Sequence, residues 1–340
     1  MDRVNVLITG IGSAGVGEQI LKALKISDLN LFIVGTDISN ICFNKNKVDK
    51  FLIVPPVSSN NYGESIRNLI DNYNIKAIFP GSEPELKYFS NNSSKFQDVY
   101  ISANDKELID LCLNKFNTYE KLAELGIPLA KYNKIDTIYD CSDIDYFPVA
   151  LKPNTNSGGS SHIYVAFDRE ELEMFAGYML KHGIDVIAQE YIEYDNNEYT
   201  IGVSSDRDGN ILGSIILKRL INNALSTNKK FKFNNKNVII SSGISQGEFI
   251  NDENIKKQAE NIAKKIGSKG PINIQGRFCN NKLLLLEINP RLSGTTYLRT
   301  MVGYNEPANM IKQNILQQDF SYSYSTKMVL RSIVENINDN

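Results

Sequence analysis

The chain has 340 residues, with 37 basic and 39 acidic side chains and a formal net charge of −2 at pH 7. This balance argues against nonspecific nucleic-acid binding, which depends on clustered cationic surface. The length allows two or three compact units. The four cysteines form no Cys-x-x-Cys pair and there are only two histidines, which disfavours a zinc site, a disulfide framework and any mechanism that needs several histidines.

The N-terminus carries no signal-peptide pattern. Met1–Asn5 leads directly into the apolar residues Val6–Ile8, without the long apolar stretch and cleavage site of a secreted precursor. No window approaches the ~18 apolar residues that a membrane span requires. We therefore expect a cytoplasmic protein with reduced thiols and no membrane contact.

Residues 1–108 alternate between strand and helix patterns, each strand being followed by turn residues. Such alternation predicts a parallel, doubly wound α/β sheet. The expected elements are strands at Val4–Thr9, Leu31–Gly35, Phe51–Val54 and Ala77–Phe79, with a helix at Val16–Leu24.

From about residue 108 the pattern changes to helices mixed with paired strands. A helix is predicted over Asp110–Leu125, because Gly126 and Pro128 are stop signals. Residues 221–236 are rich in Asn and Lys and predict a mobile loop or an irregular hairpin. The other expected elements are strands at Phe147–Lys152, Ile163–Val165 and Val186–Ile192, a hairpin of Glu198–Val203 and Ile211–Leu217 around Asp208-Gly209-Asn210, and helices at Arg169–Lys181, Asp252–Ile266 and Asn305–Gln317.

A glycine turn near the N-terminus suggests a dinucleotide site. Gly10-Ile-Gly-Ser-Ala-Gly15 follows a strand and precedes a helix, and Asp37 ends the second strand 22 residues after Gly15. The alternative is that the glycines only permit a tight turn and close packing. The turn could also hold an anionic group of a substrate at the helix N-terminus.

The most informative stretch lies near the C-terminus. Four leucines, Leu283–Leu286, precede Glu287, Asn289 and Arg291, which predicts a buried strand that ends in polar side chains. Alternate residues of a strand share a face, so Glu287 and Asn289 point the same way. Carboxylate and amide oxygens suit Mg²⁺, and Arg291 could contact phosphate oxygens.

Further upstream, several residues suggest a phosphate and nucleotide site. Lys152 closes a buried strand before a Gly/Ser loop that includes Ser157, Gly158, Gly159 and Ser160, and such a loop can cradle phosphate. The segment Glu190-Tyr191-Ile192 could present backbone groups to an adenine edge, with Glu198 on the ribose. Lys115 could reach phosphates from the opposite side. Each has a simpler structural reading as an exposed loop, strand or helix start.

Taken in order, these elements resemble the ATP-grasp superfamily. The likeness is greatest to the branch that contains the synthetase halves of the carbamoyl-phosphate synthase large chain and related carboxylate–amine ligases, although this chain has one such unit. The resemblance implies an α/β fold, with an N-terminal doubly wound parallel-sheet (pre-ATP-grasp) domain followed by a two-subdomain α+β ATP-grasp fold. The implied parts are 1–108, a small ATP-lid subdomain at 109–185, a large subdomain with the metal site at 186–330, and a tail at 331–340.

The resemblance also implies a role for each site residue. Gln275, Glu287 and Asn289 would hold Mg²⁺, with Mn²⁺ as an alternative, on the phosphates of ATP. Arg291 would stabilise charge during transfer of the γ-phosphoryl group. The nucleotide would be bound by the lysines, the lid and the adenine and ribose residues, namely Lys115, Lys152, Ser157, Gly158, Gly159, Ser160, Glu190, Tyr191, Ile192 and Glu198.

A few weaker candidates complete the expected site. Arg219, which ends a strand before the Asn/Lys-rich segment, is either a second arginine for the acyl phosphate or a surface cation. Ser293-Gly294-Thr295 could contact the acceptor, as could Glu83 and Glu85, although helix N-termini favour acids in any case.

The expected function is an ATP- and Mg²⁺-dependent ligase that joins a small carboxylate to an amine, with neither substrate identified. Two alternatives stay open. One is an NAD(P)-dependent oxidoreductase that uses the glycine turn. The other is a non-catalytic or carbamoyl-phosphate-synthase-like ATP-binding subunit. The expected partners are small molecules, without nucleic acid or membrane, and a homodimer is a possible assembly because dimers are the commonest oligomers.

Overall fold

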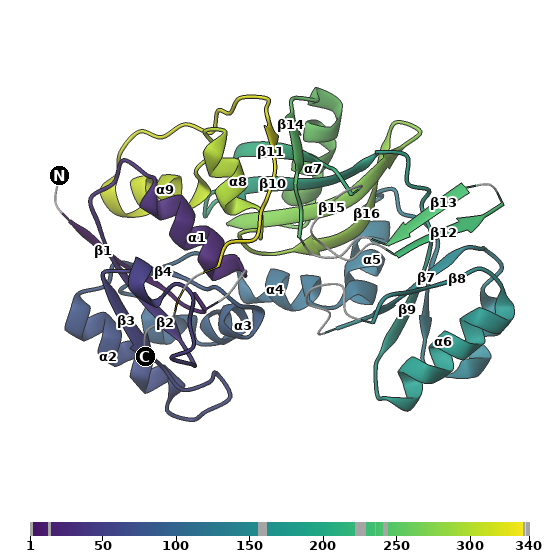
Figure 1. The fold of residues 1–340 in the computed structure, drawn as a ribbon, viewed down its shortest axis with the longest axis horizontal. Helices are drawn as coiled ribbons and strands as arrows, with labels where there is room; N and C mark the ends of the chain where they lie inside the picture. Colours follow the sequence, from purple (N-terminus) through teal and green to yellow (C-terminus); the bar gives the residue numbers. More distant parts are fainter. Residues whose placement is uncertain are drawn as a thin grey trace.

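The computed structural model describes residues 3–12, 15–155, 162–221, 229–234, 236–240, 244–335 and 337. Three sheets and a separate two-stranded hairpin organise these residues. The sheets form three lobes, with the N-terminal lobe at the lower left, the large C-terminal sheet at the top and a small sheet at the right (Figure 1). Within the described residues, no helix has the length and apolar character needed to cross a membrane.

The N-terminal lobe is a five-stranded parallel sheet in the order β3-β2-β1-β4-β5. Its elements are β1 (Val4–Ile8), α1 (Val16–Lys25), β2 (Leu31–Asp37), η1 (Lys45–Lys47), β3 (Lys50–Ile53), α2 (Tyr62–Tyr73), β4 (Ala77–Phe79), α3 (Glu83–Asn91), η2 (Ser93–Phe96) and β5 (Tyr100–Ile101). Val6 and Ile8 pack with α1 on one face, whereas Leu7 packs with α2 and α3 on the other. The predicted doubly wound parallel sheet is confirmed.

The small lobe is a four-stranded antiparallel sheet in the order β6-β9-β7-β8. Its elements are β6 (Tyr132–Ile135), η3 (Ile138–Asp143), β7 (Val149–Pro153), β8 (Tyr164–Ala166), α6 (Arg169–Lys181) and β9 (Val186–Glu190). Leu172, Ala176 and Met179 recur at helical spacing and bury the inner face of α6 against this sheet. Residues 156–161 of the predicted glycine loop lie outside the described residues.

The large lobe is a six-stranded antiparallel sheet in the order β16-β15-β10-β11-β14-β17. Its elements are β10 (Glu198–Ser205), β11 (Ile211–Arg219), β14 (Gly247–Ile250), α7 (Glu253–Lys265), β15 (Pro271–Cys279), β16 (Lys282–Asn289), α8 (Thr296–Met301), α9 (Glu306–Ile311), η5 (Lys312–Leu316) and β17 (Met328–Val329). Ile201, Ile274 and Leu285 join α7 in the main core on one face. The opposite face packs in part against α8, and Leu217 and Leu298 belong to the same apolar cluster there.

Two predicted helices differ from the structure. The helix expected over Asp110–Leu125 is two helices, α4 (Lys106–Cys112) and α5 (Lys115–Glu124). The side chain of Asn114 between them accepts from the Asn117 N–H at 2.9 Å, so it caps and begins α5. The helix expected over Asn305–Gln317 is α-helical only in α9 and continues as the π-helix η5.

The segment predicted as a mobile loop or irregular hairpin contains a regular hairpin. Strands β12 (Lys229–Phe233) and β13 (Lys236–Ile240) pair antiparallel and lie between the small and large lobes (Figure 1). Residues 222–228 of the same segment lie outside the described residues, as do residues 336 and 338–340 of the predicted tail.

Two glycines permit the close crossing at the centre of the N-terminal sheet. A Cβ atom on Gly81 would lie 2.0 Å from the Thr9 carbonyl oxygen and 2.9 Å from the Cα of Gly17. A Cβ atom on Gly17 would lie 2.4 Å from the Gly10 carbonyl oxygen. The ends of β1 and β4 and the start of α1 therefore meet at the point where the strand order reverses, which is where open α/β sheets bind ligands.

Gly81→Ala is expected to lower the free energy of unfolding by about 1–3 kcal/mol, because the added methyl group meets backbone atoms that cannot move aside. Urea denaturation followed by circular dichroism measures the change. Gly177→Ala in α6 is the matched control, since its Cβ would meet only the Ile138 Cδ1 at 3.8 Å. The control should be neutral or stabilising by up to about 1 kcal/mol. Equal unfolding midpoints for the two variants would contradict the packing argument.

Candidate active site

A cavity of about 350 Å³ lies where the three lobes meet. Its walls combine Gly15 and Glu83 from the N-terminal lobe, Lys115 from α5, and residues of β7, β9, β10, β15 and β16. A cavity of this size can enclose a small molecule. Most of the residues singled out from the sequence line it, although they are spread over about half of the chain.

The end of β16 faces this cavity because of a β-bulge. Leu283 and Leu285 point into the main core, so strict alternation would send Glu287 there as well. Gly276 pairs with Leu285 while the next pair joins Gln275 to Glu287, so Leu286 is an extra residue on β16. This extra residue reverses the alternation and turns Glu287 out of the core and into the cavity.

The predicted metal residues come together at this strand end. The Asn289 Nδ2 donates to the Glu287 Oε1 at 2.9 Å, so the two side chains share a face as expected. Gln275 lies directly opposite Glu287 on β15, and all three line the cavity. One carboxylate and two amides form a set of oxygen donors that suits a hard cation when phosphate oxygens complete the shell.

Arg291 links this strand end to the N-terminal lobe. Its Nη2 lies 2.9 Å from the Glu83 Oε1 and donates to the Asn289 Oδ1 at 3.3 Å. Glu83 therefore lies in the cavity. Glu85 does not line it: Tyr62 and Ser82 donate to its carboxylate beneath the glycine turn. Burial raises the pKa of Glu85 above its ordinary value.

Lys152 is held inside the protein by Gln189. The lysine Nζ donates to the Gln189 Oε1 at 2.6 Å, and the Gln189 Nε2 donates to the Leu285 carbonyl at 3.0 Å. Burial, and then the nearby charge of Lys115, lower the pKa of Lys152 to about 7. Asn154 accepts from the backbone of Phe116 at 2.8 Å, which docks the end of β7 on the start of α5 and brings the two lysines together.

The predicted adenine segment continues from β9 along the cavity wall. Glu190, Tyr191 and Ile192 all line the cavity. The Tyr191 hydroxyl donates to the Ile239 carbonyl at 3.1 Å and accepts from the Ile239 N–H at 2.7 Å, which ties this segment to β13. The Glu190 carboxylate accepts from the Lys131 N–H at 3.2 Å. The contacts place the segment beside the cavity, and its role toward adenine stays a prediction.

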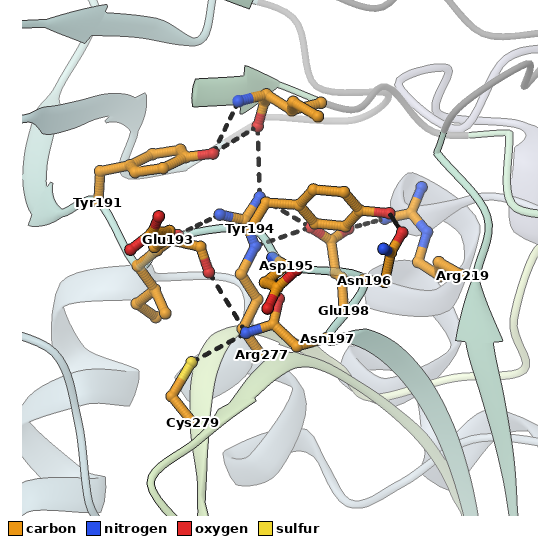
Figure 2. A network of polar contacts seen from close by, with 12 residues as sticks. Tyr191, Glu193, Tyr194, Asp195, Asn196, Asn197, Glu198, Arg219, Arg277 and Cys279 are labelled. Atoms are coloured by element: carbon orange, nitrogen blue, oxygen red, sulfur yellow. Dashed lines mark hydrogen bonds and ion pairs between the residues drawn. The ribbon is translucent and has the colours of Figure 1, made fainter. Parts of the chain in front are cut away.

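Glu198 lies between two arginines (Figure 2). It is 1% exposed, and its oxygens lie 2.6 Å from the Arg219 Nη1 and 2.9 Å from the Arg277 Nη2. The residue order suggests ribose binding for Glu198, and for Arg219 either contact with the acyl phosphate or a place at the surface as a cation. The surface position of Arg219 is wrong, because its side chain is 6% exposed and pairs with Glu198 in one buried cluster. A ribose at this place would contact a carboxylate that already accepts from both arginines.

Arg277 also belongs to this cluster, although it was not among the residues expected from the sequence. Its guanidinium lies over the rings of Tyr191 and Tyr194, at 4.9 and 5.5 Å from their centroids, and donates to the carbonyls of Ile192 and Ile239. Figure 2 shows these groups converging from separate elements. Arg277 comes two residues after Gln275 on the same strand, so the shared face was a usable signal.

The other predicted residues either line the cavity or lie outside the described residues. Ser293, Gly294 and Thr295 line the cavity. Ser157, Gly158, Gly159 and Ser160 lie outside the described residues. The cavity also contains residues for which the sequence offered no signal, namely Thr118, Tyr119, Thr200, Ser245 and Asn273.

The glycine turn does not present a free acid for a ribose. The Asp37 carboxylate accepts from the backbone N–H groups of Gly12 at 2.8 Å, Ile38 at 2.8 Å and Ser39 at 3.3 Å. Asp37 thus stabilises its own turn. Gly15, at the start of α1, reaches the edge of the cavity instead.

The lobes, the two lysines of the cavity and its oxygen donors are those expected of the ATP-grasp class. Residues 185–337 match the family described as "ATP-grasp in the biosynthetic pathway with Ter operon", and residues 6–104 match the "PylC-like, N-terminal domain". The chain therefore carries an ATP-grasp domain, preceded by a PylC-like N-terminal domain.

Relatives and solved structures agree with this assignment. The chain is 26% identical over 193 residues to the arginine-specific carbamoyl phosphate synthase large chain of Bacillus subtilis (strain 168), covering 56% of this chain and 18% of that protein. It is 24% identical over 229 residues to the C-terminal section of the large chain from Aquifex aeolicus (strain VF5), covering 61% and 37%. The chain therefore spans well under half the length of either relative.

Two solved structures share the fold. The L-amino acid ligase from Bacillus licheniformis superposes with a TM-score of 0.65 at 16% identity, over 92% of this chain and 74% of that chain. The N5-carboxyaminoimidazole synthetase from Staphylococcus aureus complexed with ADP has a TM-score of 0.66 at 16% identity, over 96% and 80%. Both likenesses concern the fold alone.

ADP binding is expected to take up a proton at about pH 8 and none at about pH 6, since the buried Lys152 is mostly neutral above its pKa and bound phosphate favours its charged form. Titration calorimetry of ADP with magnesium in buffers of different ionisation enthalpy counts the proton. In Lys152→Arg the charge is permanent, so the uptake should vanish. Unchanged uptake in that variant would assign the proton to another group.

Proposed function

We propose that this chain is an ADP-forming ligase that activates a small carboxylate as an acyl phosphate, which an amine then attacks to form a C–N bond. One observation carries the proposal. Lys115 and Lys152, the oxygen donors Glu287 and Asn289, and Arg291 all line the same cavity between the lobes. Phosphoryl transfer requires these components: the lysines are cations for the phosphates, the oxygen donors are ligands for a hard cation, and the arginine can stabilise charge on the transferred group.

The donor set fits magnesium. Within the described residues no group of three or more His, Cys, Asp or Glu side chains gathers, so a site that relies on protein carboxylates alone is not formed there. Gln275, Glu287 and Asn289 supply a mixed set, which is what Mg²⁺ uses when substrate phosphates provide the remaining oxygens. When bound, the ion would neutralise charge on the phosphates.

The chain's own residues would act by positioning and charge. Lys115 and Lys152 would hold the phosphates, and Arg291 would lie beside the group being transferred. A carboxylate oxygen attacks the γ-phosphorus and ADP leaves; the amine then attacks the acyl carbon, phosphate leaves, and the amine loses its proton. Such catalysis depends mainly on electrostatics, so it does not require a histidine.

The three lobes suggest a role for each part of the chain. We infer a pre-ATP-grasp domain at 1–108, a lid subdomain at 109–185, a large subdomain with the metal residues at 186–330 and a tail at 331–340. The contact between Arg291 and Glu83 lies where the pre-ATP-grasp domain and the large subdomain meet in the cavity wall. It supports an acceptor site shared by these two parts.

The direct test is ADP release with MgATP and a panel of amino acids, bicarbonate and small carboxylates. We expect release that depends on both a carboxylate and an amine. Glu287→Gln should reduce the rate at least ~100-fold, because it removes the carboxylate at the phosphate site. Glu248→Gln, the same change on the exposed face of β14, is the control and should leave the rate unchanged.

Two results would count against the proposal. One is the absence of acceptor-dependent ADP release with every carboxylate and amine of the panel. The other is an equal rate in Glu287→Gln and wild type, which would place any observed hydrolysis outside this cavity.

A further inference from the structure

A fully buried ion pair lies directly behind the cavity. The Nη1 of Arg299, on α8, is 2.9 Å from the Oε2 of Glu306, which opens α9; the two side chains are 1% and 0% exposed. The Ser204 hydroxyl donates to the other Glu306 oxygen at 3.3 Å. Desolvating two charges is costly, and a well-packed apolar pair often serves stability as well. Stability alone therefore does not account for the Arg299–Glu306 pair, and its contacts indicate another role.

The middle strand of the sheet makes room for this pair. A Cβ atom on Gly202 would lie 2.1 Å from the Arg299 Nη1 and 3.2 Å from the Glu306 Oε1. Gly202 faces the same side of β10 as Thr200 and lies opposite Asn273 on β15. The guanidinium can thus cross above β10 and reach β15.

There the guanidinium sets the orientation of one amide. The Arg299 Nη2 donates to the Asn273 Oδ1 at 2.5 Å, and the Thr200 hydroxyl donates to the same oxygen at 2.8 Å. A guanidinium has no acceptor, so the side of the Asn273 amide that meets it must be the oxygen. Both N–H donors of Asn273 are consequently turned away from Arg299.

Asn273 and Thr200 line the cavity, next to the proposed phosphate-transfer site. Asn273 lies directly opposite Asn289 in the β15–β16 pairing and two residues before Gln275 on the same strand face. Its side chain is 2% exposed, so water does not compete freely for its donors.

On the basis of the proposed function, we propose that Asn273 donates a hydrogen bond to a carboxylate oxygen of the acceptor, and that Arg299 and Glu306 are positioning residues that hold the amide in this orientation. The acceptor oxygen stays negative before phosphoryl transfer and again when the amine attacks. A preoriented donor stabilises that charge without having to reorganise.

The test measures ADP release with MgATP and an equimolar mixture of the twenty proteinogenic L-amino acids, each of which is both a carboxylate and an amine. Asn273→Asp keeps the shape of the side chain and its contact with Arg299 but replaces the donor by an acceptor. We expect kcat/KM for the mixture to fall about 10- to 100-fold, the loss expected for a hydrogen bond to a charged group. Calorimetric binding of ADP with magnesium should be unchanged.

Asn254→Asp, the same change on the exposed first turn of α7, is the matched control and should have wild-type kcat/KM. Arg299→Lys tests the positioning role. Lysine keeps the charge beside Glu306 but lacks the planar fork that reaches Glu306 and Asn273 together. We expect it to raise KM for the mixture, whereas the double variant with Asn273→Ala should be no worse than Asn273→Ala alone.

The outcomes separate the two proposals. A wild-type enzyme without amino-acid-dependent ADP release overturns the proposed function for this substrate class, and the role of Asn273 with it. An active wild type with undiminished kcat/KM in Asn273→Asp overturns the role of Asn273 alone. Arg299 would have a purely structural role if Arg299→Lys lowered the melting temperature without changing KM, and if its loss of kcat/KM added to that of Asn273→Ala in the double variant. If Arg299→Lys does not fold, the comparison of Asn273→Asp with Asn254→Asp still decides.

Discussion

The antiparallel pairing of β10, β15 and β16 is the constraint on which the site depends. It aligns Thr200, Asn273 and Gln275 on one face, while Ile201 and Ile274 fill the core on the other. The backbone hydrogen bonds of three neighbouring strands thus hold the polar side chains within reach of one another. A shift of one residue in this pairing would exchange the two faces and bury the polar groups in the main core.

Around this scaffold the buried charges are arranged in contact with partners. Glu198 lies between Arg219 and Arg277, and Arg299 pairs with Glu306. Lys152 has instead a neutral amide partner, so burial lowers its pKa. Because an isolated buried charge is expensive, the lysine gains most from an anionic ligand. An anion beside Lys152 would therefore favour the charged form of this lysine.

The site also depends on contacts between lobes. Arg291 connects the end of β16 to Glu83 at the start of α3, while Arg277 and Tyr191 join the β9 segment to Ile239 of the β12–β13 hairpin. Such contacts fix the relative positions of the cavity walls.

The amino-acid order was enough to predict the parallel N-terminal sheet, the hairpin around Gly209 and the shared face of Glu287 and Asn289. These features follow from local rules: strand and helix alternation, turn chemistry and the two-residue period of a strand. The break between α4 and α5 was missed because the cap made by Asn114 competes with a continuous apolar pattern. The likeness to ATP-grasp proteins, carried by the ordered polar residues, was also visible before any coordinates.

Other features arise from contacts between residues that are distant in the chain. Gln189 holds Lys152, Arg277 joins Glu198, and Arg299 orients Asn273, and each pair is separated by 26 residues or more. Local patterns could not foresee such pairs, because packing of separate elements brings them together. The direction of Glu287 is the sharpest case: the alternation of the leucines sends it into the core, and the extra residue at Leu286, set by pairing with β15, turns it toward the cavity.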